Sequence, residues 1–275
     1  METGRKSNCE LVNTYEALEH IMGINGLHPH SLSTIEQLHT KVINHTKNKK
    51  GIILDIGCGS AHGTYNLRQL LPEDVSIIGI DINNTAIDKA SKKFSEQENV
   101  SFFIGTLEEF YESHKPERII GIISISVSMF IYSTRSFYQT ANKILEDGGI
   151  FIDAPFVFKS ESNNLTEQFK NKTYQVCGCN MTMHTTNELK GFMNHANFKN
   201  VICNENEFEL MNLSTLFQDY SPTYLFTEFI NNVRKPPAPL ENNSSWYLFR
   251  RTLSIFSFFL LNRSKFGATE IIGIK

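Results

Sequence analysis

The stretch Gly51-Ile52-Ile53-Leu54-Asp55-Ile56-Gly57-Cys58-Gly59-Ser60-Ala61-His62-Gly63 decides the fold of this chain. Its apolar first half has the length of a buried strand, contains one acid, and breaks into a glycine-rich turn. A second apolar run, residues 76–81, also ends in a carboxylate. A strand, a glycine turn, a helix and a second strand with a terminal acid are the layout of a nucleotide-type cofactor site in an α/β sheet.

The spacing of the glycines separates two kinds of cofactor. A dinucleotide site has the pattern G-x-G-x-x-G, which would put glycine at position 62, where this chain has His62. The glycines stand instead at Gly57, Gly59 and Gly63, and Asp55 precedes the first of them by two residues. This spacing argues against an NAD-type oxidoreductase, and no convincing Tyr-x-x-x-Lys pair accompanies it.

The run Asp55-x-Gly57-x-Gly59 after an apolar strand resembles motif I of the class I S-adenosylmethionine (SAM) dependent methyltransferases. The resemblance implies a Rossmann-like α/β fold with a seven-stranded, mostly parallel sheet and helices on both faces. It implies SAM as the cofactor, with Asp81 placed to bind the ribose. The plainer alternative is an α/β core whose glycines serve only tight packing.

The resemblance also implies how the chain is divided. Residues 1–50 would form an N-terminal helical lid, and residues 51–275 the SAM-binding core. A helical, substrate-side insertion would occupy about residues 205–265, before the last strand. The segment Gly26-Leu27-His28-Pro29-His30 is similar to a turn that precedes the core in some small-molecule methyltransferases, although its Gly and Pro would equally suit an ordinary helix–turn–helix.

The residues that the resemblance assigns to the cofactor lie in the lid or at the carboxyl ends of the first four strands. Asp55 would orient the glycine turn and contact the methionine end of SAM. Many family members carry an Asp at the position of Thr106, so adenine would here be held by backbone groups around Thr106 and Leu107, or by Glu108. The complete expected set is Tyr15, Asp55, Gly57, Cys58, Gly59, Asp81, Ile82, Thr106, Leu107 and Ser126.

The candidate catalytic residues are His28, His30 and Tyr132, and His184 is a further candidate on the substrate side. A base is needed only if the acceptor loses a proton during attack, and no clear acid–base pair stands out. The long aromatic insertion favours a sizeable apolar or polyketide-like metabolite over a tiny polar one. A non-catalytic SAM-fold partner subunit is the alternative from a different functional class.

Hydrophobic runs and turn residues predict the remaining elements. A helix after the second strand is expected to be capped by Asn84 or Thr85. Residues 159–172 show little periodicity and are expected to form a mobile insertion over the active site. The expected strands cover residues 51–56, 76–80, 100–104, 119–125, 150–154, 198–203 and 269–274.

Metal binding is not expected. Cys177, Cys179 and His184 supply at most three ligands, whereas a structural zinc site needs four. The pair His28 and His30 has no clear third ligand. We therefore interpret the cysteines as ordinary thiols.

The bulk properties exclude several classes. The net charge of −3 argues against a nucleic-acid binder that depends on a broad basic surface. A polar start and the lack of an 18-residue apolar run predict a cytoplasmic protein without a secretory signal or membrane insertion. The aromatic segment 246–261 fits a core helix or a homodimer face better than a membrane surface.

Overall fold

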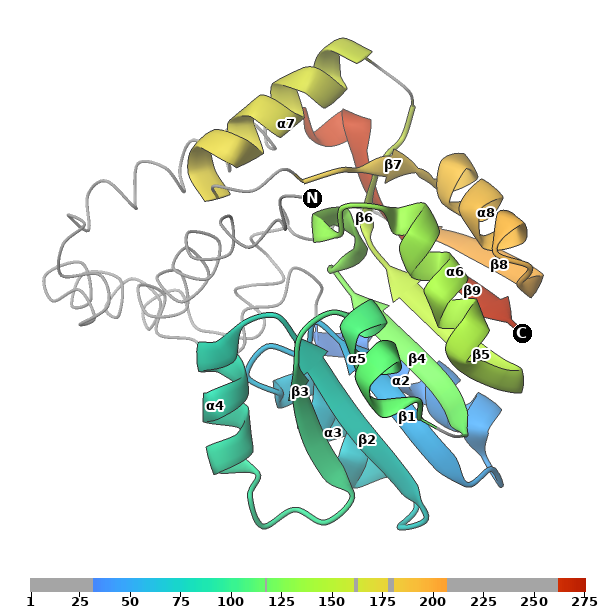
Figure 1. Cartoon of the computed structure of the whole chain (residues 1–275). Coiled ribbons are helices and arrows are strands. Elements are labelled where there is room, and N and C mark those ends of the chain that lie inside the picture. Colours follow the sequence, from blue (N-terminus) through green and yellow to red (C-terminus); the bar gives the residue numbers. More distant parts are fainter. Residues whose placement is uncertain (1–31, 117, 161–162, 178–180, 207–261) are drawn as a thin grey trace, which may run out of the picture. The chain divides into compact units, whose positions relative to one another are not determined.

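A computed structural model describes residues 32–116, 118–160, 163–177, 181–206 and 262–275 (Figure 1). The chain divides into two compact units. The first comprises Met1–Ser31, Lys159–Thr182 and Phe208–Phe266, most of which lies outside the described residues. The second unit holds the glycine turn and nearly all of the sheet, and it is the unit that carries the candidate site.

The second unit is built on a mixed sheet. Its strand order is β3-β2-β1-β4-β5-β9-β6-β7, with β8 paired to β9, which makes nine strands in the described part of the chain. Strands β1 to β5 run parallel, and β9 is antiparallel to both β5 and β8. The strands are β1 (Gly51–Ile56), β2 (Val75–Asp81), β3 (Val100–Ile104), β4 (Ile119–Ile125), β5 (Leu145–Ala154), β6 (Phe156–Phe158), β7 (His184–Thr185), β8 (Lys199–Asn206) and β9 (Phe266–Ile274).

This topology confirms the predicted Rossmann-like fold. All seven expected strands are present, and the two additional ones, β6 and β7, have three and two residues. Segments of that length are too short to show the alternation by which a strand is recognised in a sequence. The strand count therefore rises to nine without a change of fold.

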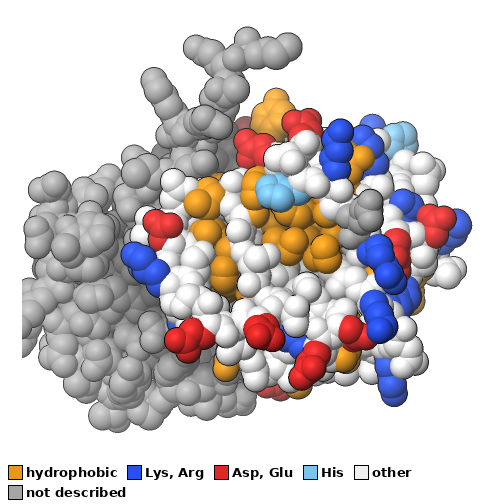
Figure 2. All heavy atoms as spheres, turned by 60° about the horizontal axis from the view of Figure 1, so that its bottom comes forward, with side chains coloured by type: hydrophobic (Ala, Val, Ile, Leu, Met, Phe, Trp, Pro, Cys, Tyr) orange, Lys and Arg blue, Asp and Glu red, His pale blue; other side chains and the backbone are white. Residues whose placement is uncertain are grey.

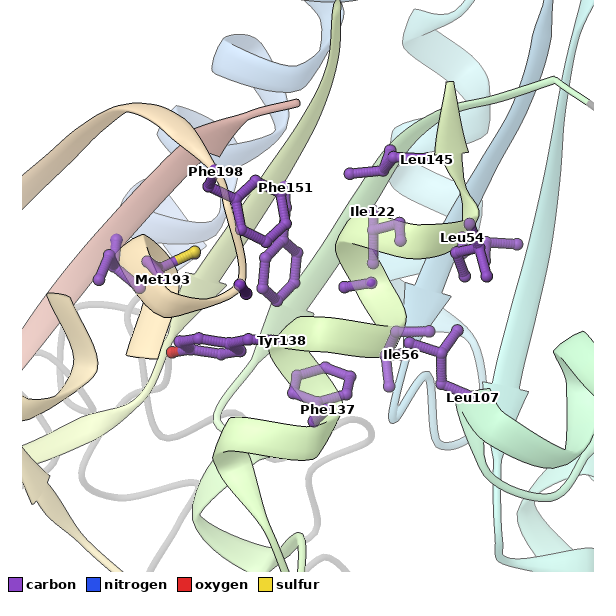
Figure 3. Close-up of a cluster of buried hydrophobic side chains, with 14 of the residues drawn as sticks. Leu54, Ile56, Leu107, Ile122, Phe137, Tyr138, Leu145, Phe151, Met193 and Phe198 are labelled. Carbon is purple, nitrogen blue, oxygen red and sulfur yellow. The ribbon is translucent and has the colours of Figure 1, made fainter. Parts of the chain in front are cut away.

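Helices cover both faces of the sheet (Figure 1). One apolar cluster joins α5, α6 and α8 to side chains such as Leu54 and Ile122, and Figure 3 shows it. A second cluster joins α2 and α3 to the alternate strand residues, such as Ile53 and Ile123. The helices are α2 (Leu32–Thr46), α3 (His62–Leu70), α4 (Asn84–Lys93), α5 (Leu107–His114), α6 (Thr134–Ile144), α7 (Asn163–Cys177) and α8 (Thr186–His195), with 3₁₀ turns η1 (Ser128–Phe130) and η4 (Arg263–Lys265).

The surface carries charges of both signs. Figure 2 shows a group of hydrophobic side chains on one face, with acidic and basic side chains distributed around it. Within the described residues, no helix combines the length and apolar character that a membrane crossing requires.

Two local expectations were wrong. The cap of α4 is Asn83, whose side chain accepts a hydrogen bond from the Ala86 N–H at 3.1 Å, so neither Asn84 nor Thr85 caps it. Residues 159–172 are not irregular, because α7 runs through most of them. In α7, only Phe169 and Thr173 are fully buried among the described side chains, and two inward residues are too few to produce a visible period.

The predicted lid is only partly described. Its second helix, α2, belongs to the same unit as the sheet, where Leu38 and Val42 are fully buried against it. Residues 1–31 and 207–261 lie outside the described residues, and so do most of the predicted insertion and the aromatic segment 246–261. The lid and insertion boundaries stay predictions.

Candidate cofactor site

The glycine turn leaves β1 through two residues with left-handed backbone. Gly57 has φ +71° and Gly59 has φ +55°, a region that residues with a Cβ enter at a cost. A Cβ on Gly57 would overlap with the side chain of Val127, whereas a Cβ on Gly59 would meet no described residue within 4 Å. Gly57 therefore has no room for a side chain, whereas the described residues leave the backbone of Gly59 accessible to a ligand.

Asp81, at the end of β2, is bound to this turn. Its Oδ2 accepts a hydrogen bond from the Gly59 N–H at 2.8 Å, and its Oδ1 accepts one from the Asn83 N–H at 2.9 Å. Burial raises the pKa of Asp81, while these N–H groups pull it down. Each carboxylate oxygen keeps a further lone pair, and the side chain is only partly buried, so the group can accept hydrogen bonds from ribose hydroxyls.

Asp55 is a buried residue of β1, two residues before Gly57. Its Oδ2 accepts a hydrogen bond from the Thr64 hydroxyl at 2.6 Å, which ties β1 to α3. Burial raises the pKa of Asp55 to about 6; the Thr64 bond opposes this rise and the charge of Asp81 adds to it. The carboxylate is thus placed to orient the turn, and a positive charge bound above it would favour its ionised form.

Cys58 is a packing residue in this turn. A Cβ on Gly79 would lie 2.8 Å from the Cys58 Sγ, so the thiol occupies the space that Gly79 leaves free. Burial raises the pKa of Cys58 well above its usual value, and the charges of Asp55 and Asp81 raise it further. Because the thiolate is the nucleophilic form, no thiol chemistry is expected here.

Thr106, one of the residues expected to hold adenine, has its N–H and hydroxyl bonded to Glu109 at the start of α5. The Thr106 hydroxyl accepts a hydrogen bond from the Glu109 N–H at 3.1 Å, and the Glu109 Oε2 accepts one from the Thr106 N–H at 2.9 Å. The Leu107 side chain is buried in the core. Ile82 and Ile104, at the ends of β2 and β3, are about half exposed and offer apolar contact on either side of Asp81.

Residues 126–130, which we call the β4 exit, follow β4 and lie beside the turn, where Val127 is next to Gly57. Ser126 is buried and has φ +60°, and its N–H donates to the Ala154 carbonyl at 3.0 Å. Its hydroxyl has no hydrogen-bond partner among the described residues. An unpaired buried hydroxyl at a strand end beside an open turn is typical of a position that meets a ligand or water.

A family comparison decides what this site belongs to. The family model described as "Methyltransferase domain" matches residues 47–218, well over half of the 275-residue chain. The chain belongs to this methyltransferase family. The match confirms the predicted membership of the class I SAM-dependent superfamily, whose cofactor is SAM.

Individual relatives of the chain are distant. It is 28% identical over 108 residues to "Probable thiol methyltransferase 2" from Arabidopsis thaliana, a match that covers 38% of this chain and 46% of the relative. The chain spans about half the length of the curated relatives that it matches. These relatives support the family and leave the acceptor open.

Solved structures share the fold. A SAM-dependent methyltransferase from Thiobacillus denitrificans in complex with S-adenosylhomocysteine is 12% identical, with a TM-score of 0.63 over 93% of this chain and 96% of that one. The [4+2]-cyclase SpnF is 11% identical, with a TM-score of 0.69 over 96% of this chain and 93% of that one. At this identity the likeness concerns the fold alone.

The residues expected on the acceptor side are only partly among the described residues. Tyr15, His28 and His30 lie outside the described residues, and Tyr132 follows η1 with a fully exposed side chain. The His184 Nε2 lies 3.2 Å from the Thr134 hydroxyl. The structure thus brings together the residues of β1, β2 and the β4 exit that are expected to bind the cofactor. The catalytic roles of His28, His30 and Tyr132 stay predictions.

Metal ligands are not grouped in the described residues. No cluster of three His, Cys, Asp or Glu side chains that could hold an ion is found there. Cys177 ends α7, and Cys179 lies outside the described residues.

Sequence reasoning missed several residues that support the site. Thr64 holds Asp55, Asn83 both caps α4 and donates to Asp81, and Val127 fills the space beside Gly57. Thr64 and the Asn83 cap are visible in the sequence, but the sequence alone does not show that they bond to Asp55 and Asp81. Val127 gives no local signal, because its role depends on a contact between β4 and β1.

Proposed function

We propose that this protein transfers a methyl group from SAM to a small-molecule acceptor. The observation that carries the proposal is the arrangement of Asp81 and Gly59. The Asp81 carboxylate binds the backbone of a turn that is open at Gly59, and it keeps lone pairs for a ribose. The family match and the glycine spacing both support SAM over a dinucleotide.

The residues of the chain supply binding and orientation. When bound, SAM supplies a methyl group on a positively charged sulfur, which is already a strong electrophile. Asp81 would hold the ribose, and the open backbone at Gly59 would admit the rest of the cofactor. Asp55, whose pKa is about 6, is mostly ionised at neutral pH and would orient the turn from below. Correct placement of the acceptor then supplies much of the rate enhancement.

The acceptor is proposed to be an apolar or polyketide-like metabolite. The support is compositional, from the aromatic segment between β8 and β9. A thiol is the second candidate acceptor, because the Arabidopsis relative is named as a thiol methyltransferase. We also propose that His28, His30 or Tyr132 takes part in catalysis. We further propose a homodimer, a cytoplasmic location and no nucleic-acid partner.

A labelled-methyl assay tests this function. The full chain is incubated with methyl-labelled SAM and with three separate acceptors: a polyketide phenol, an aliphatic carboxylic acid and an aromatic thiol. Transfer to at least one acceptor, abolished in Asp81→Asn, is the expected result. Binding of SAM without transfer to any acceptor, or to a metabolite extract, would favour the non-catalytic partner subunit.

A further inference from the structure

His184 is the first residue of β7, the short strand that leads into α8 (Figure 1). Only 18% of its side chain is exposed. The sequence suggests His184 as a candidate on the substrate side, and a histidine that acts as a base there needs a ring nitrogen free to take a proton. The partners of its two ring nitrogens therefore decide what His184 can do.

Two side chains of α8 hold the His184 ring. The Glu188 Oε1 lies 3.9 Å from the His184 Nδ1, which is ion-pair distance when the ring is protonated. Glu188 is itself fixed, because its Oε2 accepts hydrogen bonds from the Thr185 N–H at 2.8 Å and from the Thr185 hydroxyl at 2.9 Å. The Phe192 ring lies one helical turn further on, and it meets the His184 ring edge-on with the centroids 5.0 Å apart. The orientation of the imidazole is therefore set by α8.

The second ring nitrogen of His184 faces α6. Its Nε2 lies 3.2 Å from the hydroxyl of Thr134, the buried first residue of that helix. The Thr134 hydroxyl donates in turn to the Ser128 carbonyl, in a long hydrogen bond of 3.5 Å. A hydroxyl has a single hydrogen, so Thr134 can donate to Ser128 only while Nε2 carries its own hydrogen and donates to Thr134. We assign this tautomer to His184 from its partners, and in it Nε2 cannot take a proton from an acceptor.

The Ser128 carbonyl belongs to the β4 exit, which lies beside the cofactor turn. At the start of the β4 exit, the Ser126 N–H donates to the Ala154 carbonyl at 3.0 Å. Two residues further on, the Ser128 carbonyl is held by α6. Between these two points, Val127 lies so close to Gly57 that a Cβ on the glycine would overlap with it. The printed hydrogen bonds therefore connect His184 to the residue that packs against the turn.

We propose that His184 is a positioning residue, which holds the β4 exit through Thr134 in the place where Val127 supports Gly57. The inference rests on the proposed function, because it assumes that the turn at Gly57 binds SAM. His184 then acts on the cofactor turn through the β4 exit and takes no proton from the acceptor. This role replaces the catalytic one that a histidine on the substrate side would suggest.

A double-mutant cycle tests whether His184 and Thr134 act through their shared hydrogen bond. Titration calorimetry measures the affinity of the full chain for S-adenosylhomocysteine in wild type, His184→Leu, Thr134→Val and the double variant. We expect each single variant to bind about threefold more weakly than wild type, in the lower part of the range for the loss of one hydrogen bond. The double variant should also bind about threefold more weakly, because the second change has no shared bond left to remove.

Two further variants separate this role from a general loss of structure. Thr134→Ser keeps the hydroxyl and should bind as wild type does. Ser133→Ala removes the cap of the same helix, where the Ser133 Oγ accepts the Ser136 N–H at 3.2 Å. It should lower the urea midpoint of unfolding and leave the affinity for S-adenosylhomocysteine unchanged. If Ser133→Ala weakens binding as much as Thr134→Val does, the effect belongs to α6 as a whole and the inference is overturned.

The double variant decides between coupled and independent roles. Losses that multiply to about ninefold would overturn the inference, since independent changes add in free energy. Unchanged affinity in either single variant would overturn it as well. If Thr134→Val does not fold, His184→Gln is compared with His184→Leu: the glutamine N–H can replace the Nε2–H, so His184→Gln should bind more tightly, and equal binding would contradict the proposed bond. If wild type binds no S-adenosylhomocysteine, the proposed function fails together with the inference; if it binds and the losses multiply, only the inference fails.

Discussion

Replacement of single glycines by alanine separates the structural role of the turn from its role in binding. Gly57 and Gly59 both have left-handed backbone, but only at Gly57 does a Cβ overlap with a neighbour, the Val127 side chain. Gly63, the third glycine of the motif, lies inside α3, and a Cβ there meets nothing within 4 Å among the described residues. Gly57→Ala therefore combines a left-handed backbone with an overlap, Gly59→Ala has the left-handed backbone alone, and Gly63→Ala has neither.

The expected magnitudes follow from these surroundings. Gly59→Ala should cost about 1–2 kcal/mol of unfolding free energy, the penalty for a left-handed residue with a Cβ. Gly57→Ala adds an overpacking cost of about 1–3 kcal/mol to that penalty. Gly63→Ala should stabilise the protein by up to about 1 kcal/mol, because alanine is the better helix former.

Affinity for S-adenosylhomocysteine, measured by calorimetry beside the denaturation curves, gives the second readout. We expect Gly59→Ala to lose at least about tenfold in affinity, equivalent to about 1.4 kcal/mol, because its methyl group enters the open space above the turn. Gly63→Ala should bind as wild type does. If Gly59→Ala binds as tightly as Gly63→Ala, the cofactor does not approach the turn at Gly59, and the proposed site is wrong.

Further predictions concern the acids and one lid residue. Asp81→Asn should weaken S-adenosylhomocysteine binding by about tenfold or more in calorimetry, because an amide replaces a charged acceptor. It should also lower the melting temperature, because the amide nitrogen cannot accept one of the two backbone N–H bonds that Asp81 accepts. Burial raises the pKa of Asp55 and of Asp153 from the ordinary 3.8 to about 6, so each group binds a proton more tightly in the folded protein than in the unfolded one. The stabilisation from this proton is complete below pH 3.8 and is lost as the pH rises through about 6. The free energy of unfolding should fall by about 3 kcal/mol per group over this range. In urea denaturation, Asp153→Asn should therefore lose one such step relative to wild type, and an unchanged pH profile would contradict the buried carboxylate. Tyr138→Phe should cost about 1–3 kcal/mol, since it removes a donor from a buried acid. His28→Ala should lower methyl transfer and leave cofactor affinity intact; loss of both would mean that the residue is not specifically catalytic.

The fold was predictable because its signals are local. Short stretches of sequence hold the apolar runs of β1, β2 and β4, the turn at Gly57 and the Thr185–Glu188 capping box at the start of α8. The helix α7 could not be predicted, because it is mostly polar and only Phe169 and Thr173 are fully buried among its described side chains. Its buried residues contact segments that are distant in the sequence; the ring centroids of Phe169 and Phe266 are 5.9 Å apart.

The cofactor-binding residues of the candidate site could be predicted from the sequence, whereas the contacts that support them could not. Asp55, Asp81 and the glycines were identified because the chemistry of the site requires these residue types at fixed spacing. The hydrogen bond between Asp153 and Tyr138 was not identified, since an acid within an apolar strand gives no indication of a partner on another element. The acceptor could not be predicted, because a pocket is formed by side chains far apart in the sequence, and no spacing rule connects them.

The most direct measurement of the central claim is a paired titration of the full chain with S-adenosylhomocysteine and with NADH. We expect saturable binding of S-adenosylhomocysteine, weakened by Asp81→Asn, and no binding of NADH, because His62 stands where a dinucleotide turn needs glycine. Binding of NADH, or S-adenosylhomocysteine binding that is unchanged in Asp81→Asn, would contradict the account.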